Sequence, residues 1–246
     1  MDGERHPRLM SARSVLILAH GQPSDPAPAA AELAALAARV AEHLPGWKVG
    51  SVTLAEPGAV ARAVAGRAGG LVYPLFMAGG WFTRVQIPAK LTEAGALGWQ
   101  VLEPFGCDPA VHDLCVTLAR EAGAEALILA AHGSSKSQVP SDIARHVAGR
   151  IADECVSARV AVGFIDQSPQ LSSLSGFGDR ATCLPFFAAT GGHVTGDVPQ
   201  ALAEAGFAGR ILPPVGSDAR VPALIAAAIL RGVTVCAQAC RWTMAG

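Results

Sequence analysis

Three side chains in the second half of the chain have types and positions suited to metal chemistry. His132 and His193 each follow an apolar run and stand beside glycines, and Asp166 ends a third apolar run. Neutral imidazoles together with a carboxylate suit a divalent transition metal. A lone His at a strand end is as often structural, and an Asp at that place also serves as a helix cap, so both alternatives stay open.

The segments that carry these residues occur twice in the chain. The run ending in His20 reappears at His132, an offset of 112 residues that also relates Trp81 to His193. The segment 104–108 returns at 214–218 with nearly the same offset. The sequence therefore predicts an internal duplication in which one copy has lost its second imidazole.

Aligning the prolines that follow the matching runs places Leu54 at the position of Asp166. The second copy then has two His and one Asp at strand ends. The first copy has His20, Leu54 and Trp81, and we expect its site to be degenerate.

Apolar runs of strand length alternate with helical patterns, which predicts an α/β fold with parallel sheets and right-handed crossovers. We expect two duplicated, doubly wound halves that face a shared cleft, with ligands at the carboxyl ends of the strands. The expected division is a flexible leader (1–13), an N-terminal half (14–122), a C-terminal half (123–232) and a tail (233–246). In the first half we expect strands at 14–19, 47–54, 70–76 and 100–102, and helices at 26–43, 57–68, 88–95 and 108–121.

Composition and charge exclude several classes of function. The 246 residues are 51% hydrophobic and 16% charged with a net charge of −1, and no basic run suggests nucleic acid or an anionic membrane as partner. The apolar segments 15–19 and 221–230 are too short for a signal core and a membrane span, so we expect a cytoplasmic protein. Neither a GxxxxGK[ST] loop nor a GxSxG elbow occurs, which argues against ATP use and serine hydrolysis.

The six cysteines and the histidines outside the candidate site are expected to have no role in the chemistry. The six cysteines form no CxxC pair, which argues against a disulfide framework or a structural zinc site. Cys236 and Cys240 lie four residues apart and could share a helix face, but we interpret them as ordinary unpaired thiols. Surface or packing roles are expected for His6, His43, His112 and His146.

The chain resembles the class II, ATP-independent tetrapyrrole chelatases, and within them the long two-repeat sirohydrochlorin cobalto- and ferrochelatases. The resemblance rests on LAAHGSS at 129–135, FID at 164–166, PFF at 185–187, GGH at 191–193 and DVP at 197–199. It extends over nearly the whole chain, from about residue 15 to 232.

This resemblance implies insertion of Fe²⁺ or Co²⁺, with Ni²⁺ as a further candidate, into a macrocycle held between the halves. His132 and His193 would then bind the incoming metal or accept pyrrole protons, and Asp166 would be an acidic metal ligand. The expected substrate-binding residues are Ser134, Ser135, Lys136, Gly191, Gly192, Arg84, Trp81 and His20. Lys136 and Arg84 could equally be plain surface charges, whereas Trp81 could stack on the macrocycle with His20 as a helper across the cleft.

Two other functions remain open from the sequence. A degenerate homologue could carry a tetrapyrrole or a metal without catalysis, and an unrelated metal hydrolase would explain the strand-end ligands but not the duplication. We expect siroheme or cobalamin synthesis as the context, the metal as substrate, and neither ATP nor an organic cofactor. A monomer or a homodimer is expected.

Overall fold

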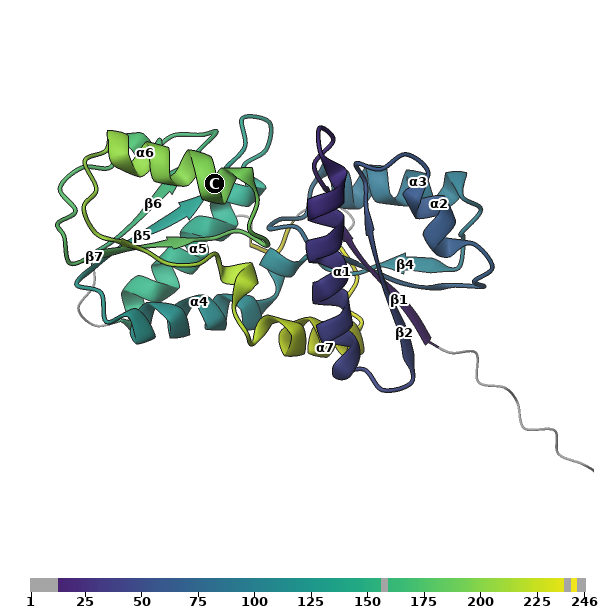
Figure 1. The fold of residues 1–246 in the computed structure, drawn as a ribbon. Coiled ribbons are helices and arrows are strands. Elements are labelled where there is room, and N and C mark those ends of the chain that lie inside the picture. The colour runs from purple at the N-terminus through teal and green to yellow at the C-terminus, as the bar shows by residue number, and fades with distance from the viewer. Residues whose placement is uncertain (1–12, 156–158, 237–239, 243–246) are drawn as a thin grey trace, which may run out of the picture.

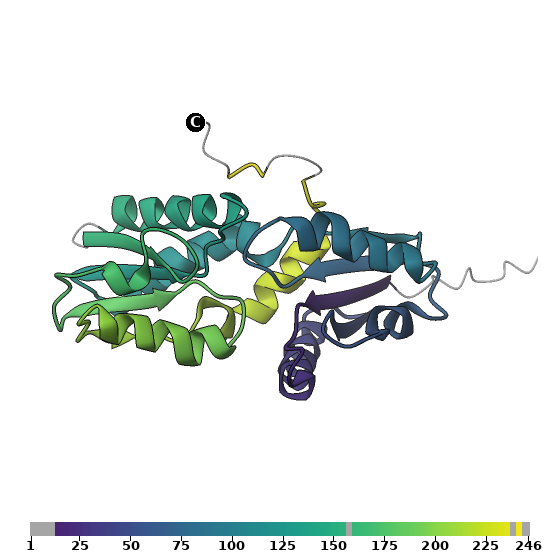
Figure 2. The ribbon, with the colours of Figure 1, turned by 90° about the horizontal axis from the view of Figure 1, so that it is seen from above.

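The computed structural model describes residues 13–155, 159–236 and 240–242, which form two α/β lobes lying side by side (Figures 1 and 2). Each lobe contains a four-stranded parallel sheet, in the orders β2-β1-β3-β4 and β6-β5-β7-β8. This confirms the predicted fold class. The strands are β1 (Arg13–Ala19), β2 (Trp47–Thr53), β3 (Gly70–Pro74), β4 (Trp99–Val101), β5 (Ala126–Ala131), β6 (Arg159–Phe164), β7 (Ala181–Pro185) and β8 (Arg210–Ile211). The predicted leader lies outside the described residues, except Arg13, which begins β1.

The helices follow the boundary signals of the sequence. Before α4, the Asp108 carboxylate accepts a hydrogen bond from the Ala110 N–H at 3.0 Å, Pro109 opens the first turn, and Gly123 ends the helix at a φ of 60°. The α-helices are α1 (Pro26–Glu42), α2 (Ala59–Val64), α3 (Ile87–Glu93), α4 (Pro109–Ala122), α5 (Val139–Glu154), α6 (Val198–Glu204) and α7 (Val221–Arg231). Short helical turns are η1 (Phe82–Gln86), η2 (Phe105–Cys107), η3 (Leu171–Ser173), η4 (His193–Asp197) and η5 (Val215–Ser217). No helix among these described segments is long and apolar enough to cross a membrane.

The sheets are covered on both faces, which explains their continuous apolar strands. In β1, residues 15–18 are all buried, as are residues 127–131 in β5. The inner faces of the two sheets share one hydrophobic core with α1, α4, α5 and α7. Each outer face has its own core, formed with α2 and α3 in the first lobe and with α6 and η3 in the second.

The two lobes exchange their last helices. The helix that ends the first half, α4, packs against α5 of the second lobe, and α7 packs against α1 of the first (Figure 1). Figure 2 shows α7, in yellow, lying between the lobes. Ion pairs join Arg150 to Asp113 at 2.6 Å and Arg220 to Glu121 at 2.7 Å, so α4 is also held electrostatically to the second half. This exchange makes the lobes a single packed unit.

The backbone hydrogen bonds show that the predicted equivalence of Leu54 and Asp166 is wrong by one residue. The Asp166 N–H donates to the His132 carbonyl at 2.9 Å, and the Ala55 N–H donates to the His20 carbonyl at 2.9 Å. Ala55, not Leu54, is therefore the counterpart of Asp166. Aligning the prolines gave the wrong residue because one residue more separates the strand from its proline in the second copy.

The predicted equivalence of Trp81 in the first copy and His193 in the second is also wrong by one residue. Phe82 begins the π-helical turn η1, and His193 begins the corresponding turn η4. The His20 and Phe82 rings lie 4.9 Å apart edge to face, as the His132 and His193 rings do at 4.5 Å. Phe82 is therefore the residue that replaces the second imidazole, and Trp81 precedes it.

His112 of α4 is fully buried, and its neutral form is held by the fold. Its Nε2 lies 2.8 Å from the Gly106 carbonyl, and its Nδ1 is buried without a partner. Burial is the main cause that lowers the pKa of His112 to about 4. The nearby His146 and Arg150 lower it further, whereas the hydrogen bond to the Gly106 carbonyl and, less strongly, Asp113 oppose the shift. A proton added at Nδ1 would find no acceptor.

We therefore expect acid to destabilise the fold through His112. The unfolded chain takes up this proton near pH 6.5, whereas the folded chain resists it until about pH 4, so stability falls as pH drops between these values. The loss is about 3 kcal/mol at the low end of the range. Urea unfolding at pH 7.5 and 5.0 measures it, with His112→Gln expected to flatten the pH dependence and exposed His43→Gln to preserve it. Equal pH dependence in wild type and His112→Gln would contradict this assignment.

Candidate active site

The two predicted imidazoles meet at the carboxyl ends of β5 and β7. His132 directly follows β5, and His193 reaches it from the start of η4 after the loop that leaves β7. Their Nε2 atoms lie 3.2 Å apart, and the rings are perpendicular. Both side chains are about half exposed, so a ligand can reach them from solvent.

A carboxylate stands behind each imidazole. The Oδ2 of Asp197 lies 2.6 Å from Nδ1 of His193, and the Oδ2 of Asp166 lies 3.6 Å from Nδ1 of His132. The Gly133 carbonyl is also 3.1 Å from the His132 Nδ1. Each Nδ1 faces acceptors, and a ring that carries its proton on Nδ1 has the Nε2 lone pair free for a ligand.

Two Nε2 atoms that face each other at this distance form a site that a cation or a shared proton can occupy. With metal–nitrogen bonds of about 2.1 Å, atoms 3.2 Å apart subtend an angle of about 100° at a shared metal, which suits tetrahedral or octahedral coordination. The described residues contain no group of three or more His, Cys, Asp or Glu side chains arranged to hold a metal. A metal held by these two nitrogens alone would keep coordination positions free for other ligands.

The structure gives Asp166 a different position from the predicted one. Its carboxylate lies beside Nδ1 of His132, whereas the facing nitrogens are the Nε2 atoms, and its role as a metal ligand stays a prediction. No helix begins at Asp166, so the alternative interpretation as a helix cap is wrong. Asp197, which sequence analysis did not select, makes the closer contact. Its spacing of four residues from His193 was the available signal.

The loop after His132 is held by Gln167. Gln167 accepts a hydrogen bond from the Ser134 N–H at 3.1 Å and donates one to the Ser141 hydroxyl at 3.0 Å. Gly133 has a φ of +75°, and a Cβ there would lie 2.9 Å from the Cβ of Gln167. The turn therefore requires glycine, and it fixes the direction in which the imidazole leaves the strand.

The other predicted binding residues of this lobe lie on the same two loops. Ser135 and Lys136 are exposed beyond His132, and Gly191 and Gly192 are exposed just before His193. Between these glycines and β7, the Thr190 N–H donates to Glu32 of α1 at 3.3 Å, which ties the loop to the first lobe.

The equivalent place in the first lobe is aromatic. Phe82 packs edge to face against His20 and Trp81 and stacks on Phe76, with ring centroids 4.9 to 5.7 Å apart. Trp81 is 61% exposed. This aromatic cluster has no second metal-binding nitrogen, as predicted from the sequence, but it offers flat apolar surface.

Arg84 lies on η1, just after Trp81, but most of its guanidinium is directed inward. Its Nε and Nη2 atoms are buried without hydrogen-bond partners, and Nη2 lies 3.4 Å from the point where a Cβ of Gly79 would stand. The guanidinium therefore points into the protein. Contact between Arg84 and a substrate stays a prediction that this position does not favour.

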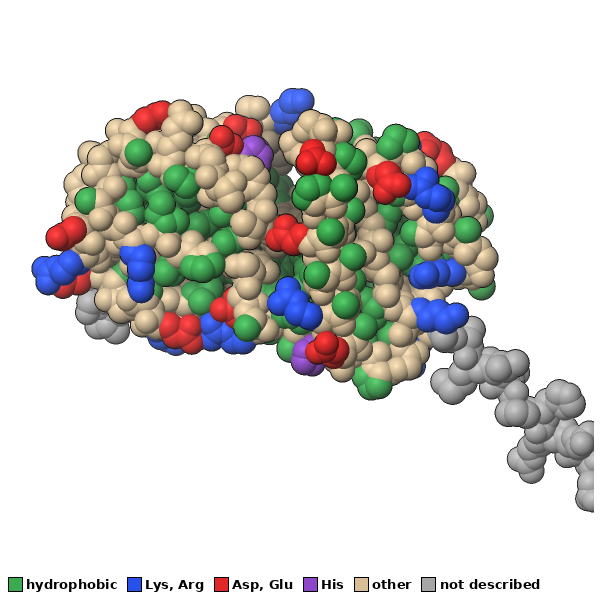
Figure 3. Space-filling model, in the orientation of Figure 1, with side chains coloured by type: hydrophobic (Ala, Val, Ile, Leu, Met, Phe, Trp, Pro, Cys, Tyr) green, Lys and Arg blue, Asp and Glu red, His purple; other side chains and the backbone are tan. Residues whose placement is uncertain are grey.

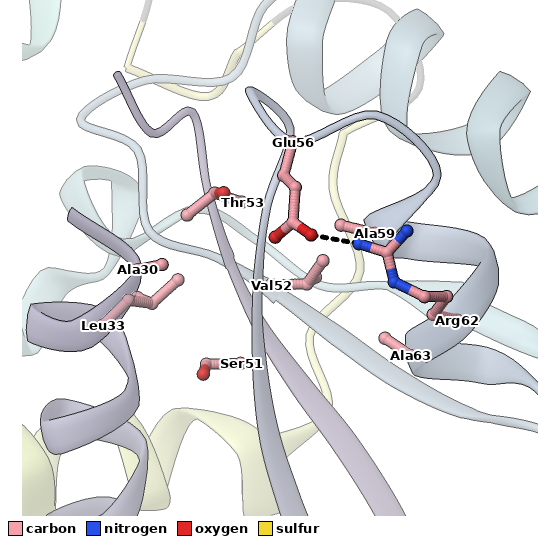
Figure 4. A pocket seen from close by; sticks show the side chains of 9 residues that line it. All are labelled: Ala30, Leu33, Ser51, Val52, Thr53, Glu56, Ala59, Arg62 and Ala63. Carbon is pink, nitrogen blue, oxygen red and sulfur yellow. Dashed lines mark hydrogen bonds and ion pairs between the residues drawn. The ribbon is translucent and has the colours of Figure 1, made fainter. Parts of the chain in front are cut away.

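A pocket of about 330 Å³ opens in the first lobe between α1, β2 and α2 (Figure 4). Its rim carries the Glu56–Arg62 ion pair, and none of the predicted site residues lines it. Thr53 stands at the register position that the buried Phe164 occupies in the second lobe, so the side chain at this repeated position is smaller in the first lobe.

The space-filling view shows the surface hollowed between the two lobes (Figure 3). A His side chain and acidic side chains lie at the rim of this hollow. An elongated or planar ligand could contact both lobes there, which agrees with the predicted shared cleft.

Comparison with known proteins identifies the family. Residues 126–231, the half that carries both facing imidazoles, match the CbiX family. The solved structure of CbiX, described as the terminal enzyme for biosynthesis of siroheme in denitrifying bacteria, is 45% identical to this chain. The similarity covers 90% of this chain and 100% of that one, with a TM-score of 0.83. A comparison with curated protein sequences finds no match.

Two more distant structures share the fold. SirB from Bacillus subtilis with Fe³⁺ is 15% identical with a TM-score of 0.69, and the similarity covers 90% of this chain and 95% of that one. The sirohydrochlorin chelatase SirB from Bacillus subtilis subspecies spizizenii, in complex with cobalt, is 16% identical with a TM-score of 0.65 over the same shares. Because the 45% identity to CbiX extends over the whole of that chain, the protein described here belongs to the CbiX family.

Proposed function

We propose that this protein inserts a divalent metal, Fe²⁺ or Co²⁺, into sirohydrochlorin or a closely related tetrapyrrole without using ATP. The observation that carries the proposal is the pair of Nε2 atoms of His132 and His193, which face each other 3.2 Å apart. Membership of the CbiX family supports the reaction, and siroheme or cobalamin synthesis is the expected context.

The geometry supports a simple sequence of steps. The metal binds between the two Nε2 atoms, held by neutral nitrogen ligands that exchange more readily than thiolates. The four ring nitrogens then replace the imidazoles, and two pyrrole protons must leave. His132 and His193 accept these protons once the metal has moved, and the carboxylates of Asp166 and Asp197 stabilise the resulting imidazolium ions.

The macrocycle would lie in the hollow between the lobes. The exposed loops at 134–136 and 191–192 supply hydroxyl, ammonium and backbone N–H groups for its carboxylate side chains. The aromatic cluster around Phe82 supplies the opposite wall, where Trp81 stacks on the ring and His20 lies at its edge. The first lobe would thus hold the substrate, while the second carries out the chemistry.

Anaerobic metal insertion tests the function. Fe²⁺ and Co²⁺ are supplied separately, and the loss of sirohydrochlorin absorbance is followed with and without protein. We expect rates well above the uncatalysed reaction with at least one metal. Binding of the pigment without acceleration would instead identify a carrier, and failure to bind the pigment would refute the tetrapyrrole assignment altogether.

Replacement of Trp81 by Ala is expected to weaken substrate binding without removing the chemistry. The loss of ring stacking, about 1 kcal/mol, should raise KM five- to tenfold and leave kcat within about twofold. Leu97→Ala, at another strongly exposed apolar side chain, is the matched control and should change neither constant. Equal KM values for Trp81→Ala and wild type would show that Trp81 does not contact the substrate.

We further propose that the protein works in the cytoplasm, as a monomer or a homodimer. Its apolar segments are too short for a signal core or a membrane span, which supports that location.

A further inference from the structure

A chain of hydrogen bonds runs from the exposed side of α5 to the loop that follows His132. The Arg145 guanidinium donates to the Ser141 hydroxyl oxygen at 3.0 Å, and the Gln167 side-chain amide donates to the same oxygen at 3.0 Å. The amide oxygen of Gln167 in turn accepts the Ser134 N–H at 3.1 Å. Because Ser134 lies two residues after His132, this chain ends beside one of the two facing imidazoles.

The hydroxyl of Ser141 fixes the direction of the Gln167 side-chain amide. Ser141 is fully buried, and its hydroxyl donates its single proton to the Gln138 carbonyl at 2.8 Å. Its oxygen therefore only accepts in its other two bonds, which come from Arg145 and Gln167. The amide must then turn its N–H group toward Ser141 and its oxygen toward the Ser134 N–H. The loop thus meets an acceptor whose orientation is set by a buried hydroxyl behind it.

The segment that contains Gln167 also contacts His132 directly. The Asp166 N–H donates to the His132 carbonyl at 2.9 Å, and the Asp166 carboxylate lies 3.6 Å from Nδ1 of the His132 ring. Gly133 packs so closely on Gln167 that a Cβ there would lie 2.9 Å from the Cβ of Gln167. Since these contacts surround a single residue, a shift of Gln167 is transmitted to the imidazole of His132.

The positions on α1 that correspond to Ser141 and Arg145 of α5 are alanines. Buried residues recur with the same spacing in the two helices, at Leu33, Leu36, Ala37 and Val40 in α1 and at Ala144, Val147, Ala148 and Ile151 in α5. On this alignment Ala30 stands at the position of Ser141, and Ala34 stands at the position of Arg145. A methyl group neither donates nor accepts a hydrogen bond, so the same network cannot form in the first lobe.

The position of Gln167 also differs between the lobes. Glu56 directly follows the counterpart of Asp166 and therefore corresponds to Gln167, but its carboxylate pairs with Arg62 of α2. The first lobe thus builds the same sheet without the network, and it is also the lobe in which Phe82 replaces the second imidazole. The network therefore accompanies the pair of imidazoles and is not a requirement of the fold.

We propose that Gln167 and Ser141 are positioning residues of the candidate active site, which hold the imidazole of His132 in line with that of His193. This inference rests on the proposed function and extends it. Gln167 acts on His132 through the loop, and Ser141 acts through Gln167. A small displacement of a reacting group lowers the rate of the chemical step, whereas substrate binding depends on many other contacts, so kcat should fall and KM should change little.

A double-mutant cycle in the metal-insertion assay tests this order of action. We expect kcat to fall about tenfold in Gln167→Ala and about fivefold in Ser141→Ala, with KM within about twofold of wild type. The double variant should lose no more than Gln167→Ala alone, because Ser141 has no effect once Gln167 is gone. Unchanged kcat in Gln167→Ala, or losses that multiply in the double variant, would overturn the proposal.

Ser217→Ala is the matched control for the loss of a hydroxyl. The Ser217 hydroxyl donates to the carbonyl three residues before it at 2.8 Å, as the Ser141 hydroxyl does, but it lies on η5. This variant should keep both kcat and KM. A fall of kcat in Ser217→Ala equal to that in Ser141→Ala would show that the loss is a general effect of removing such a bond, against the proposal.

NMR of the imidazole rings distinguishes failure of this inference from failure of the proposed function. The ring signals of His132 and His20 in the metal-free protein are assigned by their loss in the corresponding alanine variants. Gln167→Ala should shift the signals of His132 and leave those of His20 in place, and Ser217→Ala should move neither. Wild type that inserts no metal would refute the proposed function, and the His132 signals would still decide the inference. Unmoved His132 signals in Gln167→Ala would refute the positioning role alone.

Discussion

His193→Ala is expected to lower kcat for metal insertion by two to three orders of magnitude. The substitution removes one of the two facing Nε2 atoms, so the metal loses a ligand and the pyrrole protons lose an acceptor. Positioned proton acceptors contribute about 10²- to 10⁴-fold to catalysis, which sets the size of the expected loss. Anaerobic assays with sirohydrochlorin and Fe²⁺ or Co²⁺ measure it directly.

The first lobe supplies the matched control for this experiment. His20 occupies the repeated position of His132, but Phe82 faces it in place of a second imidazole. We therefore expect His20→Ala to keep kcat within about threefold of wild type. Asp197→Asn keeps the imidazole of His193 and removes only the charge behind it, with an expected loss of about tenfold. A collapse of kcat in His20→Ala equal to that in His193→Ala would show that the reaction does not belong to the second lobe alone.

Gly216→Ala is expected to destabilise the protein by about 3 kcal/mol or more. A Cβ at this position would lie 1.9 Å from the Ala188 carbonyl oxygen, and the Gly216 N–H donates to Phe187 at 2.9 Å, so the backbones cannot separate without losing that bond. The clash falls at the start of the loop that carries His193. Thermal and urea unfolding should show the loss, and the folded fraction should also insert metal more slowly.

Gly149→Ala is the control for this substitution. Gly149 lies inside α5, has open space around its Cβ position and does not adopt a positive φ, so Ala should stabilise the helix by about 0.5 to 1 kcal/mol. Gly106 repeats the arrangement of Gly216 in the first lobe, with a Cβ position 2.2 Å from the Met77 carbonyl oxygen. Unchanged stability in Gly216→Ala would mean that this close approach is not a constraint on the fold.

Several features were predictable because they depend on local patterns. Continuous apolar runs between helical segments indicated covered parallel strands, and the structure has strands and helices close to every range expected in the first half. His132 and His193 were found because each follows such a run into a loop with glycine. The duplication was visible because equivalent landmarks kept nearly the same offset along the chain.

Both one-residue errors come from aligning the copies on a residue type and not on the backbone register. One residue more separates the strand from its proline in the second copy, so aligning the prolines selected Leu54 and not Ala55. The segment from β3 to η1 is as long as that from β7 to η4, but the Gly pair stands one residue nearer the π-helical turn in the second copy, so aligning the Gly pairs selected Trp81 and not Phe82. The backbone hydrogen bonds of the strands and the starts of the π-helical turns settle the register.

The fold class, the duplication and the two strand-end imidazoles were predictable from the sequence alone, because strand burial and position at a strand end are local properties of the chain. The exchange of α4 and α7 between the lobes, the contact of Asp197 with His193 and the inward direction of Arg84 are visible in the folded protein alone. Of the segments that these features join, α1 and α7 lie about 180 or more residues apart, and the other features depend on contacts between nearer segments or on the direction of a side chain. Packing and charge compensation in the folded protein select them, and no periodicity in the sequence encodes that choice.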